Sequence, residues 1–519
     1  MMSGAVSAGH PATAQAAATI LKEGGNAFDA VLAGMAAACV CEPVLCSLGG
    51  GGFLMAKPES GEPRILDFFA QTPLRHPDAR ARNFFPALCD FGAVQQEFHI
   101  GMAAMATPGL ARGMFEVNKL LGRMPLGQIL EPAIIFAKEG VPLHRLQAYI
   151  FQVVGPIYME TEASRAIFES KVNPGNLVGE GDLVANPQFA DFLDALVHEG
   201  DDLFYRGEIA ARVAEDCRAQ GGTLTRTDFE VFKLEHRRPL SLAYADAQIY
   251  TNPPPSTGGL LIAFALSILR DLGAQDVAFG SSTHLTALVQ AMALTNEARI
   301  ESRMHEAPAE EAAAVLLSEE MIDVYRRRIA PYPRSYRGTT HISVVDSNGN
   351  AASLTLSNGE GCGYIVPNTG MMMNNMLGEE DINPHGFHNW PPNTRMSSMM
   401  APSLIVEPTG RVTALGSGGS NRIRTAILQV LINILNFNMP VGDAVSSPRI
   451  HYERDLLNVE PGFLESTVNC LSKHFGDIKR WDELNLFFGG VHAVRSDVRR
   501  GGVDGVGDPR RGGVSIVTS

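Results

Sequence analysis

Hydrophobic and polar residues alternate along residues 340–345, which read Thr-His-Ile-Ser-Val-Val. A period of two predicts a half-buried β-strand, with the isoleucine on one face and the histidine and serine on the other. Residues 346–349, Asp-Ser-Asn-Gly, are typical of a tight turn because Asn and Gly accept positive φ values, and residues 351–356 then form the returning strand. The pattern predicts a hairpin that begins directly after Thr339.

The N-terminal pattern is helical. Apolar and small residues predict one helix over 11–22 and a second over 27–41, separated by a Gly-Gly-Asn stop. Four glycines at 49–52 then lead into a strand, and another strand is expected at 64–69. The glycine run has neither GxGxxG nor GK[ST] spacing, so it predicts close backbone packing rather than a phosphate loop.

The middle of the chain, residues 110–329, reads as largely helical, with the rigid loop Asn-Pro-Pro-Pro-Ser-Thr-Gly-Gly at 252–259 leading into an apolar helix. Residues 321–338 are basic and contain two prolines, which predicts an exposed connector. Beyond the connector the chain is β-rich, with further strands near 402–407 and 411–416. No internal repeat interrupts this order.

Composition and charge narrow the class of protein. The chain has 519 residues, of which 45% are hydrophobic, enough for a large globular core, and its formal charge of −14 argues against nucleic-acid and anionic-membrane partners. Seven cysteines without paired CxxC spacing predict neither a disulfide framework nor a zinc site. We expect no signal peptide, no transmembrane helix and a cytoplasmic location.

An exposed connector that ends directly before a strand threonine is the arrangement of an N-terminal nucleophile hydrolase. In such a precursor the Thr339 hydroxyl attacks the carbonyl of Gly338, and the ester that forms is hydrolysed. The freed α-amino group, with an ordinary pKa of about 8, then serves as the adjacent base. On this window alone, the simpler interpretation is favoured, in which the Gly-Thr-Thr run only starts a strand, because Gly-Thr pairs are common in turns.

The remaining motifs favour the catalytic interpretation, because eight segments in order resemble the γ-glutamyltransferase (glutathione hydrolase) family. They are HPATAQAAATILKEGGNAFDAVLA near the N-terminus, EPVLCSLGGGGFLM, ATPGLARGMFEV at 106–117, NPPPSTGGL at 252–260, TTHISVVDSNGN at 339–350, NTGMMMNN at 368–375, RMSSMMAPSL at 395–404 and GSGGSNRI at 416–423.

The resemblance implies an α+β fold, the four-layer αββα sandwich of N-terminal nucleophile hydrolases. It also implies self-cleavage into a large subunit, 1–338, and a small subunit, 339–519, which interleave in one catalytic unit. The implied reaction is acyl transfer from a small amide substrate, through a Thr339 acyl-enzyme, to water or an amine acceptor. No cofactor or metal is implied.

The resemblance also assigns the catalytic residues. Thr339 would be the nucleophile, and either Ser357 or Asn358 would steady it. Gly418 and Gly419 would give backbone N–H groups to an oxyanion hole, although a Gly-Gly pair is equally common in an ordinary turn.

A second set of residues would bind substrate. Ser397 and Ser398 would hydrogen-bond the substrate carboxylate, whereas Asn375 and Glu379 would lie at its α-amino group. The alternatives are an ordinary serine cap and a solvated acidic run at 379–381. His341 and His10 are expected to be structural, because a free α-amine makes a histidine base unnecessary.

The chain departs from the family at the carboxylate clamp. Phe69 stands where relatives carry an arginine, and loss of a bidentate Arg–carboxylate pair should weaken γ-glutamyl binding by roughly 2–4 kcal/mol. Arg75, Arg395 and Arg422 are candidate replacements, expected within reach of Ser397 and Ser398.

The replacement of this arginine by Phe69 leaves two substrate classes open. Glutathione-type γ-glutamyl compounds are the first, and another small amide acid, such as oxamate or a glutaryl or cephalosporin side chain, is the second. A non-catalytic, uncut member of the family is a further alternative. The sequence does not determine the oligomeric state, and a homo-oligomer is one of the alternatives.

Overall fold

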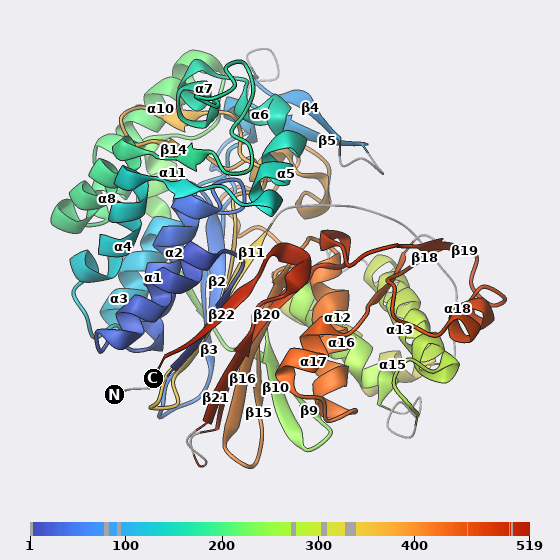
Figure 1. Ribbon diagram of the computed structural model, residues 1–519. Helices are drawn as coiled ribbons and strands as arrows, with labels where there is room; N and C mark the ends of the chain where they lie inside the picture. Colours follow the sequence, from blue (N-terminus) through green and yellow to red (C-terminus); the bar gives the residue numbers. More distant parts are fainter. Residues whose placement is uncertain are drawn as a thin grey trace.

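The computed structural model describes residues 4–76, 82–90, 95–270, 277–302, 309–326, 339–453, 455–497, 499 and 502–518. Two antiparallel sheets lie at its centre, with a layer of helices on the outer face of each (Figure 1). In this part of the chain, none of the helices combines the length and the apolar character that a membrane span needs.

The first sheet has seven strands, and its chain order is highly non-sequential. From edge to edge it contains β22 (Val514–Thr518), β1 (Gly4–Ala8), β11 (Thr340–Val345), β12 (Ala351–Ser357), β2 (Gly51–Lys57), β3 (Arg64–Phe68) and β8 (Glu235–Arg237). The predicted hairpin is its centre: β11 pairs with β12, from Thr340 opposite Leu356 to Val345 opposite Ala351.

The second sheet has six strands and packs face to face on the first. It contains β21 (Gly502–Val506), β20 (Gly490–Asp497), β16 (Arg411–Gly418), β15 (Ser403–Val406), β10 (Ala247–Thr251) and β9 (Leu240–Tyr244). The Ser353 hydroxyl on β12 donates to the Leu415 carbonyl oxygen on β16, 2.9 Å away. Hydrogen bonds therefore cross between the sheets as well as along them.

Helices cover both outer faces and complete the αββα sandwich (Figure 1). The first sheet is covered by α1 (Pro11–Lys22), α2 (Ala27–Cys41), α3 (Leu110–Leu121), α4 (Leu126–Glu139) and, further out, α8 (Pro187–Glu199). The second is covered by α12 (Gly258–Leu269), α13 (Ser282–Glu301), α15 (Glu319–Arg326), α16 (Arg422–Leu435) and α17 (Val441–Ser446).

Smaller elements surround this sandwich. The remaining strands are β4 (Phe85–Asp90), β5 (Gln95–Ile100), β6 (Val141–Pro142), β7 (Leu183–Val184), β13 (Ile365–Val366), β14 (Met371–Met372), β17 (Ile450–Glu453), β18 (Leu456–Val459) and β19 (Asp477–Arg480). The remaining helices are α5 (Arg145–Val153), α6 (Gly155–Tyr158), α7 (Glu162–Phe168), α9 (Asp202–Tyr205), α10 (Glu208–Gln220), α11 (Arg226–Val231), α14 (Ala309–Leu316) and α18 (Glu465–Leu471).

The two N-terminal helices begin and end as predicted. Asn26 caps α2 by accepting from the backbone N–H groups of Phe28 and Asp29, and the Asp29 carboxylate accepts in return from the Asn26 N–H. The small residues of α2 allow close packing on the first sheet, where a Cβ at Gly34 would lie 3.3 Å from Ile342. This explains why an Ala-rich helix is buried along its whole length.

Three sequence predictions need correction. The first is the half-buried strand at 340–345, whose six residues are all buried. The second sheet covers the polar face: the Ser343 hydroxyl donates to the His492 carbonyl oxygen 3.3 Å away. Alternation therefore marks two chemically different buried faces here, not one buried and one solvated face.

The second concerns region 110–329, which is largely helical as predicted but also supplies β8, β9 and β10, which were not expected. These strands are only three to five residues long, too short to stand out between long helical stretches.

The third concerns the connector 321–338, predicted to be exposed throughout. Residues 321–326 belong to α15, where Tyr325 is buried with its ring edge-on to Phe264 at a centroid separation of 5.6 Å. Residues 327–338 lie outside the described part of the chain.

Both sheets contain strands from before and after Thr339. In the first sheet β11 lies between β1 and β12, and in the second β15 pairs with β10. The segments 1–338 and 339–519 are thus interleaved, and neither contains all the strands of either central sheet. Cleavage between them stays a prediction.

Candidate active site

Thr339 lies directly before the central strand β11 and is 5% exposed. Its carbonyl oxygen accepts a hydrogen bond from Arg511 Nη1, 3.0 Å away. Burial lowers the pKa of the Arg511 guanidinium to about 10, which still leaves it charged near neutral pH. The backbone of the predicted nucleophile is therefore held by a buried cation.

The adjacent threonine has a different environment. The Thr340 hydroxyl donates to Glu42 Oε2 at 2.7 Å, and the Thr13 hydroxyl donates to Glu42 Oε1 at 2.9 Å. Burial raises the pKa of the Glu42 carboxyl, and these two hydrogen bonds oppose that shift. The buried carboxyl at the end of α2 thus fixes Thr340 and, through it, the start of β11.

The predicted oxyanion glycines lie against Thr339. A Cβ atom at Gly418 would be 2.0 Å from the Thr339 carbonyl oxygen, a separation that no side chain can adopt. Gly419 has φ +117°, a conformation that favours glycine, and Ser420 follows with φ 54°. The loop then enters α16 directly after Asn421.

The glycine run at 49–52 supports the site from behind. A Cβ at Gly50 would lie 2.4 Å from the Ser357 carbonyl oxygen, and one at Gly51 would lie 2.8 Å from the Ala70 nitrogen. The prediction of close backbone packing is confirmed. Only residues without side chains allow β12, which carries Ser357, and the segment just after β3, which carries Phe69, to approach this closely.

A small cavity of about 40 Å³ brings the predicted residues together. Polar groups come from several distant segments, and the walls are mostly apolar. The cavity is lined by Phe69, Thr339, Ser357, Met376, Glu379, Asp381, Ile382, Ser398, Met399, Met400, Ser420 and Ile423. Asp381 and Ser420 were not singled out from the sequence, although each lies within two residues of one that was.

The two candidates for steadying the nucleophile differ in position. Ser357 lines the cavity, and its Oγ accepts from the Gly359 N–H at 3.1 Å. Asn358 is fully buried outside the lining, and neither its Oδ1 nor its Nδ2 has a hydrogen-bond partner among the described residues. The geometry favours Ser357 for direct contact with substrate.

The two residues predicted at the substrate amino group meet at Gly359. A Cβ there would lie 2.1 Å from Asn375 Oδ1 and 2.3 Å from Glu379 Oε1. Asn375 Oδ1 also accepts from the Glu360 N–H at 2.9 Å, and the Asn375 side chain is absent from the cavity wall. Glu379 lines the cavity, so Asn375 supports the loop from behind.

The predicted serine pair is divided between two pockets. Ser398 lines the Thr339 cavity, and its Oγ accepts from the Met400 N–H at 3.0 Å. Ser397 lines a larger neighbouring pocket. The segment leaves the wall of one pocket and enters the wall of the other between these two residues, which separates side chains that the sequence places together.

The structure corrects the expected replacement for the missing arginine. Arg395 Nε lies 3.5 Å from Asp67 Oδ1, Nη1 donates to the Phe69 carbonyl oxygen, and the guanidinium stacks on Phe232 at 4.6 Å. Its donors are thus directed at the protein. Arg75 is exposed, and no arginine or lysine occurs among the described residues that line the Thr339 cavity.

Arg422 is also directed elsewhere. It is 3% exposed, and its guanidinium lies over the Phe487 ring at 4.5 Å. Phe69 itself is buried and stacks on Phe53 with a centroid separation of 5.3 Å. An aromatic ring therefore forms part of the cavity wall at position 69.

The Asp67 ion pairs lead to a stability prediction. Asp67 is fully buried, 2.6 Å from Arg237 Nε, and also pairs with Arg395. We expect Asp67→Asn to lower the free energy of unfolding by about 3–5 kcal/mol, because two cations lose their carboxylate. Asp202→Asn, which removes the exposed pair with Arg206, should cost about 1 kcal/mol or less. Chemical denaturation measures both, and equal small losses would contradict the role given to Asp67.

Comparisons with known proteins place these features in context. The model of the gamma-glutamyltranspeptidase family matches residues 13–518. The glutathione hydrolase proenzyme of Escherichia coli (strain K12) is 30% identical over 495 residues, covering 88% of this chain and 82% of its own. The acylase ACY 1 proenzyme of Pseudomonas sp. (strain V22) is 28% identical, covering 90% and 86%.

The solved structures agree on the fold. The crystal structure of cephalosporin acylase from Bacillus halodurans superposes with a TM-score of 0.84, covering 99% of this chain and 96% of that one at 24% identity. The predicted αββα sandwich is confirmed.

Proposed function

The chain belongs to the gamma-glutamyltranspeptidase family, and from this premise we propose that it is a self-processing amide hydrolase and acyltransferase whose nucleophile is the Thr339 hydroxyl. One observation carries the proposal. A single cavity joins Thr339 to Ser357, Glu379 and Ser398, while the Gly418 backbone lies against the Thr339 carbonyl group.

The first reaction is maturation. The Thr339 hydroxyl oxygen attacks the carbonyl carbon of Gly338, the peptide C–N bond breaks, and the Thr339 nitrogen takes the proton as an ester forms. Water then hydrolyses the ester, which releases the Gly338 carboxylate and restores the hydroxyl. Gly338 lies outside the described residues. The proenzyme names of the relatives from Escherichia coli and Pseudomonas support this step.

The second reaction is turnover. The freed α-amine accepts the proton of the Thr339 hydroxyl as its oxygen attacks the substrate amide carbonyl. Backbone N–H groups of the Gly418–Gly419 loop stabilise the developing oxyanion, and the proton passes to the departing amine. Water or a second amine then attacks the acyl-enzyme, giving hydrolysis or transfer.

A histidine base is not needed in this scheme. The ring nitrogens of His341 lie 2.8 Å from Thr355 Oγ1 and 2.9 Å from Ser343 Oγ, so both are engaged within the sheets. Burial lowers the pKa of His341 far below its usual value. The imidazole therefore stays neutral and structural.

γ-Glutamyl compounds such as glutathione are the first substrate candidates. Two curated relatives carry the name glutathione hydrolase at 28–30% identity. Glu379 and Asp381 both line the cavity, and a carboxylate favours an ammonium group such as the α-amine of a γ-glutamyl donor.

A second candidate is an acylase-type reaction on a less charged acyl group. The observation that favours it is Phe69 in the cavity wall without a lysine or arginine in the described lining. A substrate α-carboxylate beside this ring would lose water without gaining a cation, which costs free energy. An acyl group without that carboxylate avoids the cost.

The two candidates are separated by restoring the cation. We expect Phe69→Arg to raise kcat/KM for γ-glutamyl-p-nitroanilide by about 10-fold or more relative to the wild type, because the guanidinium supplies the missing bidentate partner. Phe69→Leu is the control, since it removes the ring without adding charge. Parallel assays with oxamate and glutaryl amides define the acyl preference.

Efficient γ-glutamyl hydrolysis by the wild type would rule out the altered specificity. A fully processed wild-type enzyme that hydrolyses only glutaryl amides or oxamate would instead favour the acylase. If Phe69→Arg and Phe69→Leu change γ-glutamyl turnover equally, the clamp argument is wrong.

A further inference from the structure

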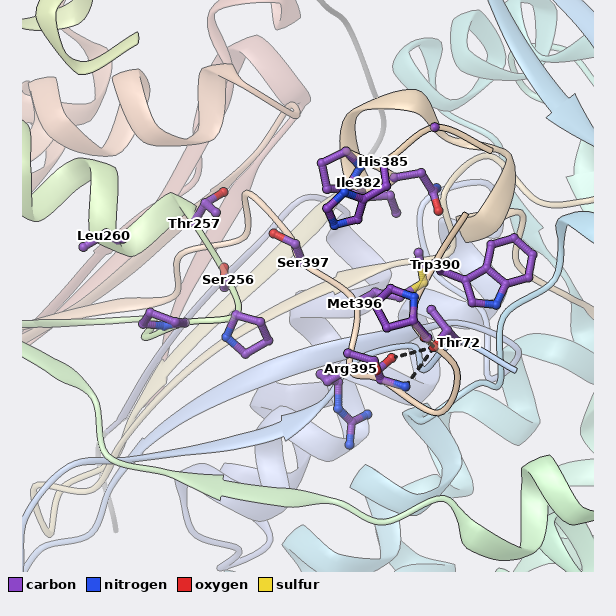
Figure 2. A pocket seen from close by; sticks show the side chains of 17 residues that line it. Thr72, Ser256, Thr257, Leu260, Ile382, His385, Trp390, Arg395, Met396 and Ser397 are labelled. Atoms are coloured by element: carbon purple, nitrogen blue, oxygen red, sulfur yellow. Dashed lines mark hydrogen bonds between the residues drawn. The ribbon is translucent and has the colours of Figure 1, made fainter. Parts of the chain in front are cut away.

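A second pocket adjoins the Thr339 cavity and is larger, about 180 Å³ against about 40 Å³. Its walls come from residues 254–260, 382–391 and 394–397, together with Thr72 (Figure 2). Prolines, Leu260, Met396 and the indole of Trp390 make these walls mostly apolar. This is the shape and chemistry of a small-molecule site.

The two pockets share structural elements. Ile382 lines both, and the segment 395–400 gives Arg395, Met396 and Ser397 to the larger pocket and the next three residues to the Thr339 cavity. The shared segment is firmly held, because the Ser398 carbonyl oxygen accepts from the Thr257 N–H at 2.8 Å. A ligand that extends past Ile382 could therefore occupy both spaces in a fixed relation to Thr339.

An amide substrate needs two such spaces, because its acyl group and its amine lie on opposite sides of the reacting carbonyl. The Thr339 cavity, about 40 Å³, has less than a quarter of the volume of the larger pocket, about 180 Å³. A bulky amine such as an anilide therefore fits the larger pocket better.

We propose that the larger pocket binds the amine half of the substrate, as the leaving group in acylation and as the acceptor in transfer. This inference rests on the proposed function and adds the class of amine to it. Its residues position substrate and take no part in the bond changes at Thr339.

The lining selects the chemistry of that amine. The charged or titratable side chains among the described lining residues are Arg395 and the exposed His385, and no aspartate or glutamate is present. The Trp390 indole N–H is buried without a hydrogen-bond acceptor in the described part of the chain. Because the Arg395 guanidinium pairs with Asp67 and donates to the Phe69 carbonyl oxygen, and the described part of the lining has no carboxylate, we expect an apolar, flat, uncharged amine and discrimination against a cationic amine.

The opposite pattern in the Thr339 cavity strengthens this assignment. There the charged residues are Glu379 and Asp381, both acidic. A substrate with an amino-bearing acyl group and an apolar, uncharged amine would match both sites, and its orientation would be fixed by the position of its ammonium group as well as by size.

The test keeps one acyl group and varies the amine. The probes are the primary amide, the anilide and the 4-(trimethylammonio)anilide of glutaric or γ-glutamic acid, whichever acyl group the wild type turns over faster. The primary amide releases ammonia and has no group to fill the larger pocket. All three substrates of one acid pass through the same acyl-enzyme, so its rate of hydrolysis is an internal control.

Trp390→Ala should lower kcat/KM for the anilide by about 10-fold or more and change that for the primary amide by less than about 3-fold. The rate of acyl-enzyme hydrolysis should not change. Trp481→Ala alters the other tryptophan of the chain and should leave unchanged the ratio of kcat/KM for the anilide to kcat/KM for the primary amide. Trp390→Phe should recover most of the anilide activity.

A filling variant provides a second approach if Trp390→Ala does not fold. Thr394 is exposed at the pocket wall. Thr394→Trp should fill the pocket and strongly lower kcat/KM for the anilide, while kcat/KM for the primary amide stays unchanged. Thr409→Trp, at an exposed turn before β16, is the matched control. In the wild type, kcat/KM should be lower for the cationic anilide than for the neutral anilide.

Equal loss on the anilide and the primary amide, or no change on either, would overturn the proposal. A preference for the cationic anilide would overturn the assigned amine class. If no probe leaves an acyl group on Thr339 of the wild type, the proposed function itself fails, and mass spectrometry of the protein distinguishes that result from a misassigned pocket.

Discussion

Thr339→Ala should remain a single chain of 55.8 kDa and should hydrolyse amides at least about 10³-fold more slowly than the wild type. The wild type should separate into pieces of about 36 and 20 kDa, in proportion to the residues before and after the cleavage point. One substitution removes both reactions because one hydroxyl performs both. Gel electrophoresis and a turnover assay on the same preparation measure the two losses.

Two controls identify the hydroxyl. Thr339→Ser keeps a nucleophilic oxygen and should still cleave. Thr340→Ala removes the neighbouring hydroxyl, whose hydrogen bond to Glu42 is structural, and should also cleave, though more slowly as the start of β11 loosens. If Thr340→Ala loses cleavage while Thr339→Ala cleaves normally, the nucleophile is Thr340 and the assignment to Thr339 is wrong.

Gly418→Ala should lower kcat by about 10²–10³-fold in the fully processed enzyme. The added Cβ would lie 2.0 Å from the Thr339 carbonyl oxygen, so the loop that carries the oxyanion donors must move. Gly419→Ala should also lower kcat, because φ +117° is strained for alanine. Steady-state kinetics, with a check that the variants are cleaved, measures the effect.

The matched control is Gly442→Ala, within α17, where an added Cβ meets no atom within 4 Å. It should retain full activity and gain slightly in stability, because alanine favours the helix. If Gly418→Ala turns over substrate as fast as Gly442→Ala does, the oxyanion donors lie elsewhere.

Much of the fold could be predicted from short-range sequence patterns. The capped helix α2, the glycine run at 49–52 and the β11–β12 hairpin all depend on local chemistry that the sequence displays directly. Burial of β11 on both faces could not be predicted, because the second sheet that covers it includes distant strands such as β20, whose His492 is 149 residues from Ser343.

The functional site likewise combines features that local motifs predict with features that depend on distant parts of the chain. Its motifs locate Thr339 and the Gly418–Gly419 loop, and the structure brings both to one place. The partners of Arg395 could not be read from its own segment, since Asp67 and Phe232 are distant in the chain. Such partners decide whether a cation is available to substrate, and three-dimensional packing alone reveals them.

The most direct test of Thr339 as a freed nucleophile is mass spectrometry of the wild-type protein quenched during turnover of its best amide substrate. We predict that the smaller fragment begins at Thr339 and that its N-terminal peptide carries the mass of the acyl group. An intact, folded chain, a different new N-terminus, or an acyl group attached to another residue would contradict this assignment.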